Sequence, residues 1–279
     1  MNATTLKPPL APVPPPRDPS VAIPALAWLV PPLMGLVSMP IWLHWFEPGL
    51  FLAINGLCAS VTAPVWTALS LLGNGWGVLG LTAPLLVLAP RLMWAWLCAA
   101  PFAVFFARTG KFLIDSPRPA ALVDNAQMRI VGETLHNVAM PSGHTLTAFA
   151  VASALFFALP AGRRARHAWL FVLAAGTGLS RIAVGAHWPG DVAAGASLGL
   201  LAGMLGHMLW TRMGPQHSQP DSWSLRLVAV LLSVAVYHLL FEALDFSENL
   251  PFQYLLAAMV AASLAVFVRQ NRHAFLHRS

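Results

Sequence analysis

The sequence predicts an all-α, polytopic transmembrane helical bundle of about eight spans. Hydrophobic residues make up 57% of the 279 residues, charged residues make up 9%, and the mean hydropathy is +0.67. Apolar segments of nearly the length that crosses a bilayer recur along the chain, separated by short polar or basic stretches. Inside a bilayer the backbone polar groups must be satisfied within each segment, so these segments are expected to be helices. This composition excludes an ordinary soluble domain.

The elements follow in order from the apolar segments. Residues 1–20 are rich in proline and predict a flexible cytoplasmic tail. Residues 21–212 are expected to form a six-helix membrane core, and residues 213–279 two further spans and a basic tail. The expected spans lie near residues 24–45, 73–90, 92–113, 142–160, 167–186, 191–210, 225–244 and 251–268.

The segment 48–72 is ambiguous, because Pro48, Gly56 and Pro64 interrupt an uncharged stretch. It could cross the membrane, re-enter it or lie at its interface. Counting it as a span would place Lys7 and Arg17 on the opposite face from the basic residues 163–166, against the positive-inside rule. We therefore expect a multi-pass protein of the inner (plasma) membrane, with both termini cytoplasmic and the motifs described below on the periplasmic or outer face.

The net charge of +6 and the pI near 10.4 do not indicate nucleic-acid binding, because the basic residues are spread between apolar segments. Cys58 and Cys98 lie inside apolar runs without metal-ligand spacing and are expected to be small buried residues.

Two segments carry groups suited to a phosphate ester, whose oxygens gain negative charge when the phosphorus is attacked. In KFLIDSPRP, Lys111 and Arg118 lie at the end of a predicted span, where prolines 117 and 119 would end the helix. In PSGH, Ser142, Gly143 and His144 would begin a helix, where N–H groups favour an anion. The simpler alternatives are basic side chains that extend to the interface and an ordinary capped helix.

The segment SRIAVGAHWPGD adds Arg181, whose guanidinium suits phosphate oxygens, and His187 with Asp191 four residues later. A carboxylate that holds one imidazole nitrogen leaves the other nitrogen free for nucleophilic attack. A metal-ligand pair or a helix cap is the alternative for this spacing. No further Cys, His or Glu cluster completes a metal site, which favours a catalytic role for this pair.

The spacing of Lys111, Arg118 and Pro119, the run PSGH, and the spacing of Arg181, His187 and Asp191 resemble the three-part motif of the type 2 phosphatidic acid phosphatase, or lipid phosphate phosphatase, superfamily. The resemblance covers about residues 50–212. It implies that His187 is the nucleophile forming a phosphohistidine, that Asp191 orients it, and that His144 protonates the leaving oxygen. It also implies that the phosphoryl group is bound by Lys111, Arg118, Ser142, Gly143 and Arg181, with no metal requirement and no cofactor.

We therefore expect a membrane phosphatase that acts on a lipid phosphomonoester or diphosphate, with isoprenyl (undecaprenyl) diphosphate as the leading substrate. Phosphatidate, phosphatidylglycerophosphate and lipid A remain alternatives, as does a lipid phosphotransferase. A lipid transporter or flippase is the non-enzymatic alternative, because His207 and His238 are polar residues within predicted spans. The oligomeric state is not predicted.

Three other features receive structural interpretations. Gly195, Gly199 and Gly203 repeat every four residues and predict close helix packing. Residues 120–140 could form a substrate lid, but a solvated loop is the simpler expectation. The acidic residues 242, 245 and 248 are interpreted as a solvated loop, and the two C-terminal spans are expected to hold no chemical residues.

Overall fold

The computed structural model describes residues 19–44 and 48–276, in which all regular secondary structure is helical. The predicted all-α fold is confirmed for this part of the chain. The proline-rich tail up to residue 18, Glu47 and Arg278 lie outside the described residues. The α-helices are α1 (Val30–Val37), α2 (Met39–Leu43), α3 (Pro48–Cys58), α4 (Ala63–Leu71), α5 (Gly75–Thr82), α6 (Leu85–Leu88), α7 (Pro90–Leu97), α8 (Ala100–Leu113), α9 (Pro119–Leu122), α10 (Gly143–Ala158), α11 (Ala161–Arg164), α12 (Trp169–Ala183), α13 (Pro189–Trp210), α14 (Trp223–Phe241) and α15 (Leu250–Leu276).

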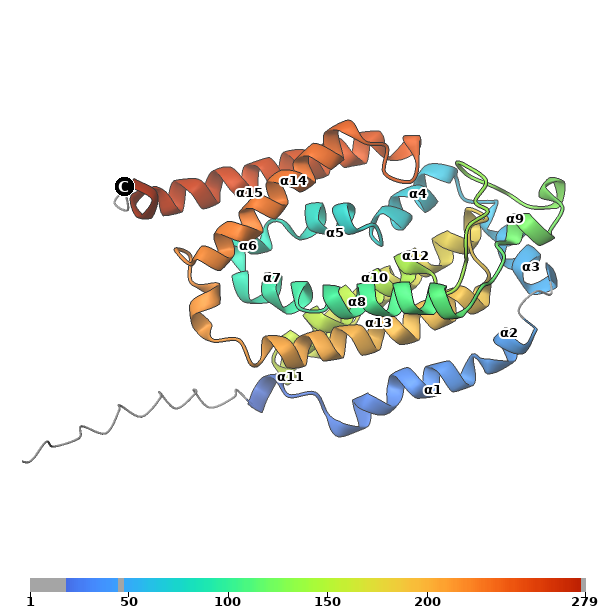
Figure 1. The fold of residues 1–279 in the computed structure, drawn as a ribbon, viewed down its shortest axis with the longest axis horizontal. Helices are drawn as coiled ribbons and strands as arrows, with labels where there is room; N and C mark the ends of the chain where they lie inside the picture. The colour runs from blue at the N-terminus through green and yellow to red at the C-terminus, as the bar shows by residue number, and fades with distance from the viewer. Residues whose placement is uncertain (1–18, 45–47, 277–279) are drawn as a thin grey trace, which may run out of the picture.

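The longer helices run along the long axis of the molecule (Figure 1). Helices α10, α12 and α13 pack together, α8 and α1 contact α13, and the α14–α15 hairpin covers α5 and α6. The loop after α8, the α12–α13 turn and the α14–α15 turn lie at one end of the bundle (Figure 1). The 3-10 helix Pro19–Val21 and the end of α15 lie at the opposite end, so the described chain begins and finishes away from the motif segments.

Within the described residues, five helical segments are long and apolar enough to cross a membrane: Ala25–Leu43, Pro90–Leu113, Pro189–Trp210, Trp223–Phe241 and Ser247–Arg272. Helices α10 and α12 are apolar but shorter. The structure differs from the expected span at residues 73–90, which is divided into α5 and α6. Pro84 lies at the break, where it has no N–H for the helical ladder. The chain is a membrane protein, and the count of eight spans stays a prediction.

The ambiguous segment 48–72 forms α3 and α4, which meet at an angle of 110°. This geometry fits either a broken span or a re-entrant loop. The bend is held by Arg129, whose Nη1 donates to the carbonyl oxygens of Cys58 (3.2 Å) and Val61 (2.7 Å). A residue between the first two motifs therefore fixes the shape of a segment about 70 positions earlier.

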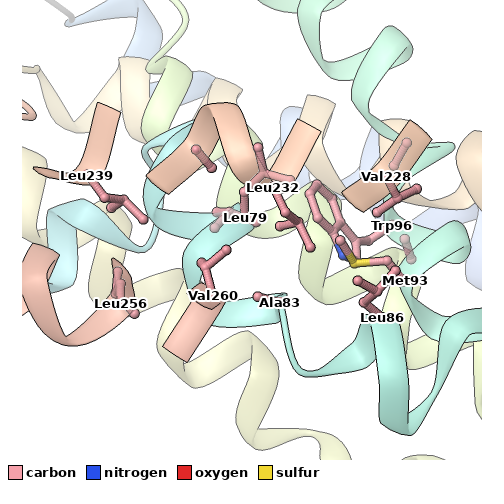
Figure 2. Packing of buried hydrophobic residues seen from close by; sticks show 14 of the residues in the cluster. Leu79, Ala83, Leu86, Met93, Trp96, Val228, Leu232, Leu239, Leu256 and Val260 are labelled. Carbon is pink, nitrogen blue, oxygen red and sulfur yellow. The ribbon is translucent and has the colours of Figure 1, made fainter. Parts of the chain in front are cut away.

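The main apolar core lies between the α14–α15 hairpin and α5–α7, and Figure 2 shows part of it. Leu232 and Leu239 of α14 and Val260 of α15 are fully buried there. The side chains of Leu232 and Val260 lie near Leu79 and Ala83, and Leu239 lies farther along α14 (Figure 2). Because lipid tails are as apolar as leucine, these side chains hold the C-terminal hairpin to the rest of the bundle through close van der Waals packing rather than through removal from water.

The predicted packing along the glycine stripe of α13 is confirmed. A Cβ atom on Gly195 would lie 2.6 Å from the backbone oxygen of Ser142, and Gly199 and Gly203 face backbone atoms of α10 in the same way. Helices α10 and α13 share the most extensive interhelical contact in the described chain. The stripe therefore sets the distance between the helix that begins with PSGH and the helix that begins after His187.

Substituting Gly199 by alanine should destabilise the protein, because the new Cβ would overlap the backbone of α10. Overpacking of this kind costs about 1–3 kcal/mol. Gly56→Ala in α3 is the matched control, since nothing lies within 4 Å of its added Cβ. Melting temperatures in detergent should fall for Gly199→Ala and stay level or rise for Gly56→Ala. Equal melting of the two variants would contradict the packing argument.

Candidate active site

The three motif segments meet at one end of the bundle and are joined by hydrogen bonds. The Ser142 N–H donates to the backbone oxygen of Asp191 (3.0 Å), which joins the second segment to the third. The Trp188 indole N–H donates to the backbone oxygen of Pro117 (2.9 Å), which joins the third segment to the first. The expected helix end is shifted, because α8 ends at Leu113, before the prolines, and residues 114–118 are not helical.

His187 lies in the short turn before α13 and is held by two neighbours. Its Nδ1 is 3.2 Å from Oδ2 of Asp191, and its Nε2 is 2.9 Å from Nη1 of Arg118. Arginine can only donate, so Nε2 accepts and Nδ1 carries the proton that Asp191 accepts. Asp191 Oδ2 also accepts the Trp188 N–H at 2.9 Å, which fixes the carboxylate at the start of α13. The imidazole is therefore in the tautomer that leaves a lone pair on Nε2.

Arg118 is 5% exposed and points into the site from the loop before α9. Besides His187, its Nη1 donates to the backbone oxygen of Ala186 at 2.7 Å. Its Nε and Nη2 donate to Oδ1 of Asn137 at 3.0 and 2.8 Å. Asn137 lies in the 120–140 loop and was not singled out in the sequence, because a loop asparagine without a motif gives no signal.

Two further cations complete the cationic side of the site. Lys111, in the last turn of α8, donates through Nζ to the backbone oxygen of Val138 at 2.7 Å. Arg181, in the last turn of α12, is 3% exposed, donates through Nη1 to the Ser70 hydroxyl, and has no described acceptor for its buried Nε. Lys111, Arg118 and Arg181 all act electrostatically on His187. A buried guanidinium N–H without a partner is suited to receive an oxyanion.

His144 is the second residue of α10, and its ring contacts the acidic loop after α14. Its Nε2 is 2.9 Å from Oδ2 of Asp245, and the two side chains are 19% and 26% exposed. Asp245 also accepts a hydrogen bond of 2.9 Å from the Asn74 side chain. The interpretation of this loop as merely solvated is wrong for Asp245. Asp245 lies in the turn between the two C-terminal spans, so the expectation that the spans themselves hold no chemical residues stays a prediction.

Ser142 and Gly143 lie where α10 begins, as the sequence predicted. Ser142 is the N-cap, and its hydroxyl accepts from the Thr145 hydroxyl (2.9 Å) and N–H (3.5 Å). The first N–H groups of a helix have no partner within the helix, so those of Gly143 and His144 are suited to bind an anion at the start of α10. No heavy atom lies within 4 Å of a Cβ built on Gly143, so open space adjoins this turn.

The 120–140 loop supports the site from outside. Besides Asn137 and Val138, it supplies Arg129, whose backbone N–H donates to Oδ1 of Asn55 at 2.8 Å. The Asn55 amide in turn donates to the backbone oxygen of Ile182 at 2.9 Å. The loop is therefore not simply solvated, and whether it acts as a lid stays a prediction.

The surroundings of His187 and Asp245 shift their proton affinities in ways that follow from geometry. Burial of His187, and then the positive charges of Arg118, Arg181 and Lys111, hold the pKa of His187 well below its usual value. Burial raises the pKa of Asp245, but the charge and hydrogen bond of His144 and the charge of Arg181 outweigh it, and the pKa lies below its usual range. His187 is therefore neutral, and Asp245 ionised, near neutral pH.

A cavity of about 420 Å³ opens beside Arg181 and Asp245. Its walls come from residues 130–135, from the α12–α13 turn and from residues 243–247. The ionisable side chains among its lining residues are Glu133, Arg181 and Asp245. The cavity thus lies next to one of the site's cations, and its walls contain both charged and apolar residues.

His207 and His238, which motivated the transporter alternative, have structural contacts away from this cluster. His207 Nε2 is 2.9 Å from the backbone oxygen of Val21, and the His238 ring stacks on Trp76 at 4.0 Å between centroids. Among residues 19–44 and 48–276, no group of three or more His, Cys, Asp or Glu side chains is arranged as a metal site. The roles of individual site residues stay predictions.

Comparison with known proteins connects this geometry to a family. A family model described as "PAP2 superfamily" matches residues 89–214. The lipid A 1-phosphatase of Porphyromonas gingivalis is 44% identical over 73 residues, which are 25% of this chain and 16% of that protein, so the match spans about a sixth of the relative. The crystal structure of Aquifex aeolicus LpxE is 27% identical, covers 57% of this chain and 92% of its own, and gives a TM-score of 0.48.

The matched segment begins just before α7 and ends just after α13. It contains every residue of the three motifs, whereas Asn74 and Asp245 lie outside it. Residues 89–214, which are a little under half of the chain, are therefore similar to the PAP2 superfamily.

Proposed function

We propose that the protein is a membrane phosphatase that removes a phosphoryl group from a lipid through a phosphohistidine on His187. The observation that carries this proposal is the state of His187. Asp191 holds its Nδ1 proton, its Nε2 retains a lone pair, and the positive charges of Arg118, Arg181 and Lys111 act on the ring. A neutral imidazole is suited to attack phosphorus when the cations beside it can bind the oxygens of the same phosphoryl group.

In the first step, the phosphoryl oxygens would be held by Lys111, Arg118 and Arg181 and by the N–H groups at the start of α10. Nε2 of His187 forms a bond to phosphorus while the bond from phosphorus to the lipid oxygen breaks. His144 donates a proton to that oxygen, and the lipid alcohol leaves. If the substrate is a diphosphate, the leaving group is the lipid monophosphate.

In the second step, water attacks the phosphohistidine. His144, now without its proton, takes one from the water, the nitrogen–phosphorus bond breaks, and inorganic phosphate leaves. Neither step needs a metal ion, because Lys111, Arg118 and Arg181 would neutralise the charge on the phosphoryl oxygens as a metal does in other phosphatases. Metal independence is part of the proposal.

The site is proposed to open on the periplasmic or outer face, with both termini cytoplasmic. Support comes from the basic residues at the end of the bundle opposite the motifs (Figure 1). A concentration of arginine at one end marks the cytoplasmic side of a membrane protein. These residues are Arg91, Arg163, Arg164, Arg166, Arg212, Arg226, Arg269 and Arg272.

A phosphorylated glycolipid is the first substrate that we propose to test. The cavity beside the site has one arginine and two carboxylates, an arrangement that suits a hydroxyl-bearing headgroup better than a second phosphate. The similarity to a lipid A 1-phosphatase supports the same class. Isoprenyl diphosphate is the second candidate, because an outward-facing site would suit recycling of a carrier lipid.

Replacing His187 by alanine should abolish phosphate release. Removing a covalent nucleophile typically costs at least about 1,000-fold in rate. The matched control is His167→Ala, because His167 lies at the opposite end of the bundle in the 3-10 helix Ala165–His167. Phosphate release is measured with protein of unchanged melting temperature. Lipid movement that persists in His187→Ala without any hydrolysis by the wild type would support a transporter instead.

The rate should depend on pH with a bell-shaped profile. His187 must be neutral to attack, and its pKa lies well below the usual histidine value of about 6.5. The rate should therefore persist as the pH falls through 6.5 and decline only in more acidic solution. The alkaline decline reports loss of the proton from His144. A steady-state profile that declines on the acid side near the usual histidine value would contradict the low pKa of His187.

A panel of lipid phosphates, with a chelator present, should rank the substrates. We expect release from a glycolipid 1-phosphate to have the highest kcat/KM, followed by isoprenyl diphosphate, with phosphatidate and phosphatidylglycerophosphate below both. Activity should be unchanged by the chelator. Reactions in ¹⁸O-labelled water, with and without an added alcohol, distinguish hydrolysis from phosphotransfer. Activity that requires added magnesium would contradict the metal-free mechanism.

A further inference from the structure

We propose that Asp245, in the turn between α14 and α15, is a positioning residue for His144 and makes the C-terminal hairpin part of the catalytic apparatus. This inference rests on the proposed phosphatase reaction. Asp245 lies 31 residues beyond the end of the segment that matches the family (245 against 214). The three motifs do not include it, and nothing in its sequence context distinguishes it from Glu242 and Glu248 nearby.

The contact is specific in geometry. Oδ2 of Asp245 lies 2.9 Å from Nε2 of His144 and accepts a second hydrogen bond of 2.9 Å from Asn74. Asn74 is itself fixed as the N-cap of α5, where its Oδ1 accepts the Trp76 N–H at 3.0 Å. Next to it, Gly73 allows close approach, because a Cβ there would lie 2.5 Å from the His144 backbone oxygen. The carboxylate is therefore held between two helix starts.

The turn that carries Asp245 is built to hold one conformation. Gln253 of α15 is fully buried and binds the turn, accepting the Leu244 N–H (3.2 Å) and donating to the Glu242 backbone oxygen (2.7 Å). Asp245 has φ = 62°, a left-handed conformation that non-glycine residues rarely adopt. Such conformations persist where the surroundings fix them, and they occur often at functional sites.

The next residue, Phe246, packs the turn against Gly132 and the proposed phosphate-binding residue Arg181. Phe246 is buried, and its ring would lie 2.8 Å from a Cβ on Gly132, which has φ = 77°. The guanidinium carbon of Arg181 lies 5.7 Å from the centre of the same ring. The packing of Phe246 thus fixes the position of Asp245 relative to both His144 and Arg181.

The chemical consequence concerns which form of His144 is present. With Nε2–H donated to Asp245, the proton for the leaving oxygen comes from Nδ1, and the imidazolium form is needed. Burial of the ring and the positive charges of Arg181 and Arg118 oppose that form, and Asp245 favours it. His187, the other titratable group nearby, is neutral. Asp245 therefore supplies the negative charge that favours the protonated form of His144 and partly offsets the burial and the nearby cations.

The test begins with Asp245→Asn, which keeps the shape of the side chain and removes its charge. We expect kcat on a lipid phosphate to fall about 10- to 100-fold with little change in KM, since general acid catalysis contributes about 100- to 10,000-fold. The alkaline limb of the kcat profile should move to lower pH. Glu248→Gln, in the same turn, is the matched control and should leave both unchanged. Asp245→Glu should recover part of the rate.

Two further measurements separate positioning from a structural role. Asp245→Asn should have little additional effect in a His144→Ala background, because its action passes through His144. The loss should also be smaller with p-nitrophenyl phosphate, whose leaving group needs no proton, than with a lipid phosphate. Melting temperatures show whether each variant is folded.

The outcomes are distinguishable. If the wild type releases phosphate and Asp245→Asn matches it in rate and pH profile, Asp245 has no such role and the proposed function stands. If Asp245→Asn loses equal activity with both substrates and in both backgrounds, its effect is structural and the inference is wrong. If the wild type releases no phosphate from any substrate, the proposed function fails and the inference fails with it.

Discussion

The structure depends on the burial of positive charge beside His187. Arg118 and Arg181 are 5% and 3% exposed, and Asp191 is fully buried. Removing an ion from water costs several kcal/mol unless hydrogen bonds and opposite charges compensate. Backbone oxygens of the 120–140 loop and the α12–α13 turn, together with Asn137, Ser70 and the two aspartates, supply that compensation. The irregular segments at this end of the bundle therefore share one effect. They supply the hydrogen-bond acceptors that hold the buried cations in place.

The C-terminal hairpin links this electrostatic requirement to the apolar core. Helices α14 and α15 bury leucine and valine against α5–α7, and Gln253 fixes the turn between them. The same hairpin thereby holds an acidic side chain beside His144. Stability at the centre of the bundle and charge balance at its end are supplied by one element, although it lies outside the part of the chain that matches the family.

Much of this could be predicted from the sequence, for physical reasons that particular residues illustrate. Long apolar segments require helices in a bilayer, and a glycine every fourth residue permits the contact between α10 and α13. The spacing of His187 and Asp191 around a helix start fixes their hydrogen bond locally. Asn74, Asn137 and Asp245 could not be found in this way, because their partners are 19 to 171 residues distant and depend on how the helices pack. The division of residues 73–90 at Pro84 was missed because hydropathy measures apolar length rather than backbone continuity.

The hydrogen bond from Arg118 to Nε2 of His187 affects when the lone pair of the proposed nucleophile is available. The lone pair that would attack phosphorus is occupied by a guanidinium proton when no anion is present. An arriving phosphate competes for that same guanidinium, and its oxygens are stronger acceptors than an imidazole nitrogen. In the proposed reaction, binding of the phosphate and release of the Nε2 lone pair would therefore occur together. Arg118 would in this way shield the proposed nucleophile from other electrophiles until a suitable anion binds.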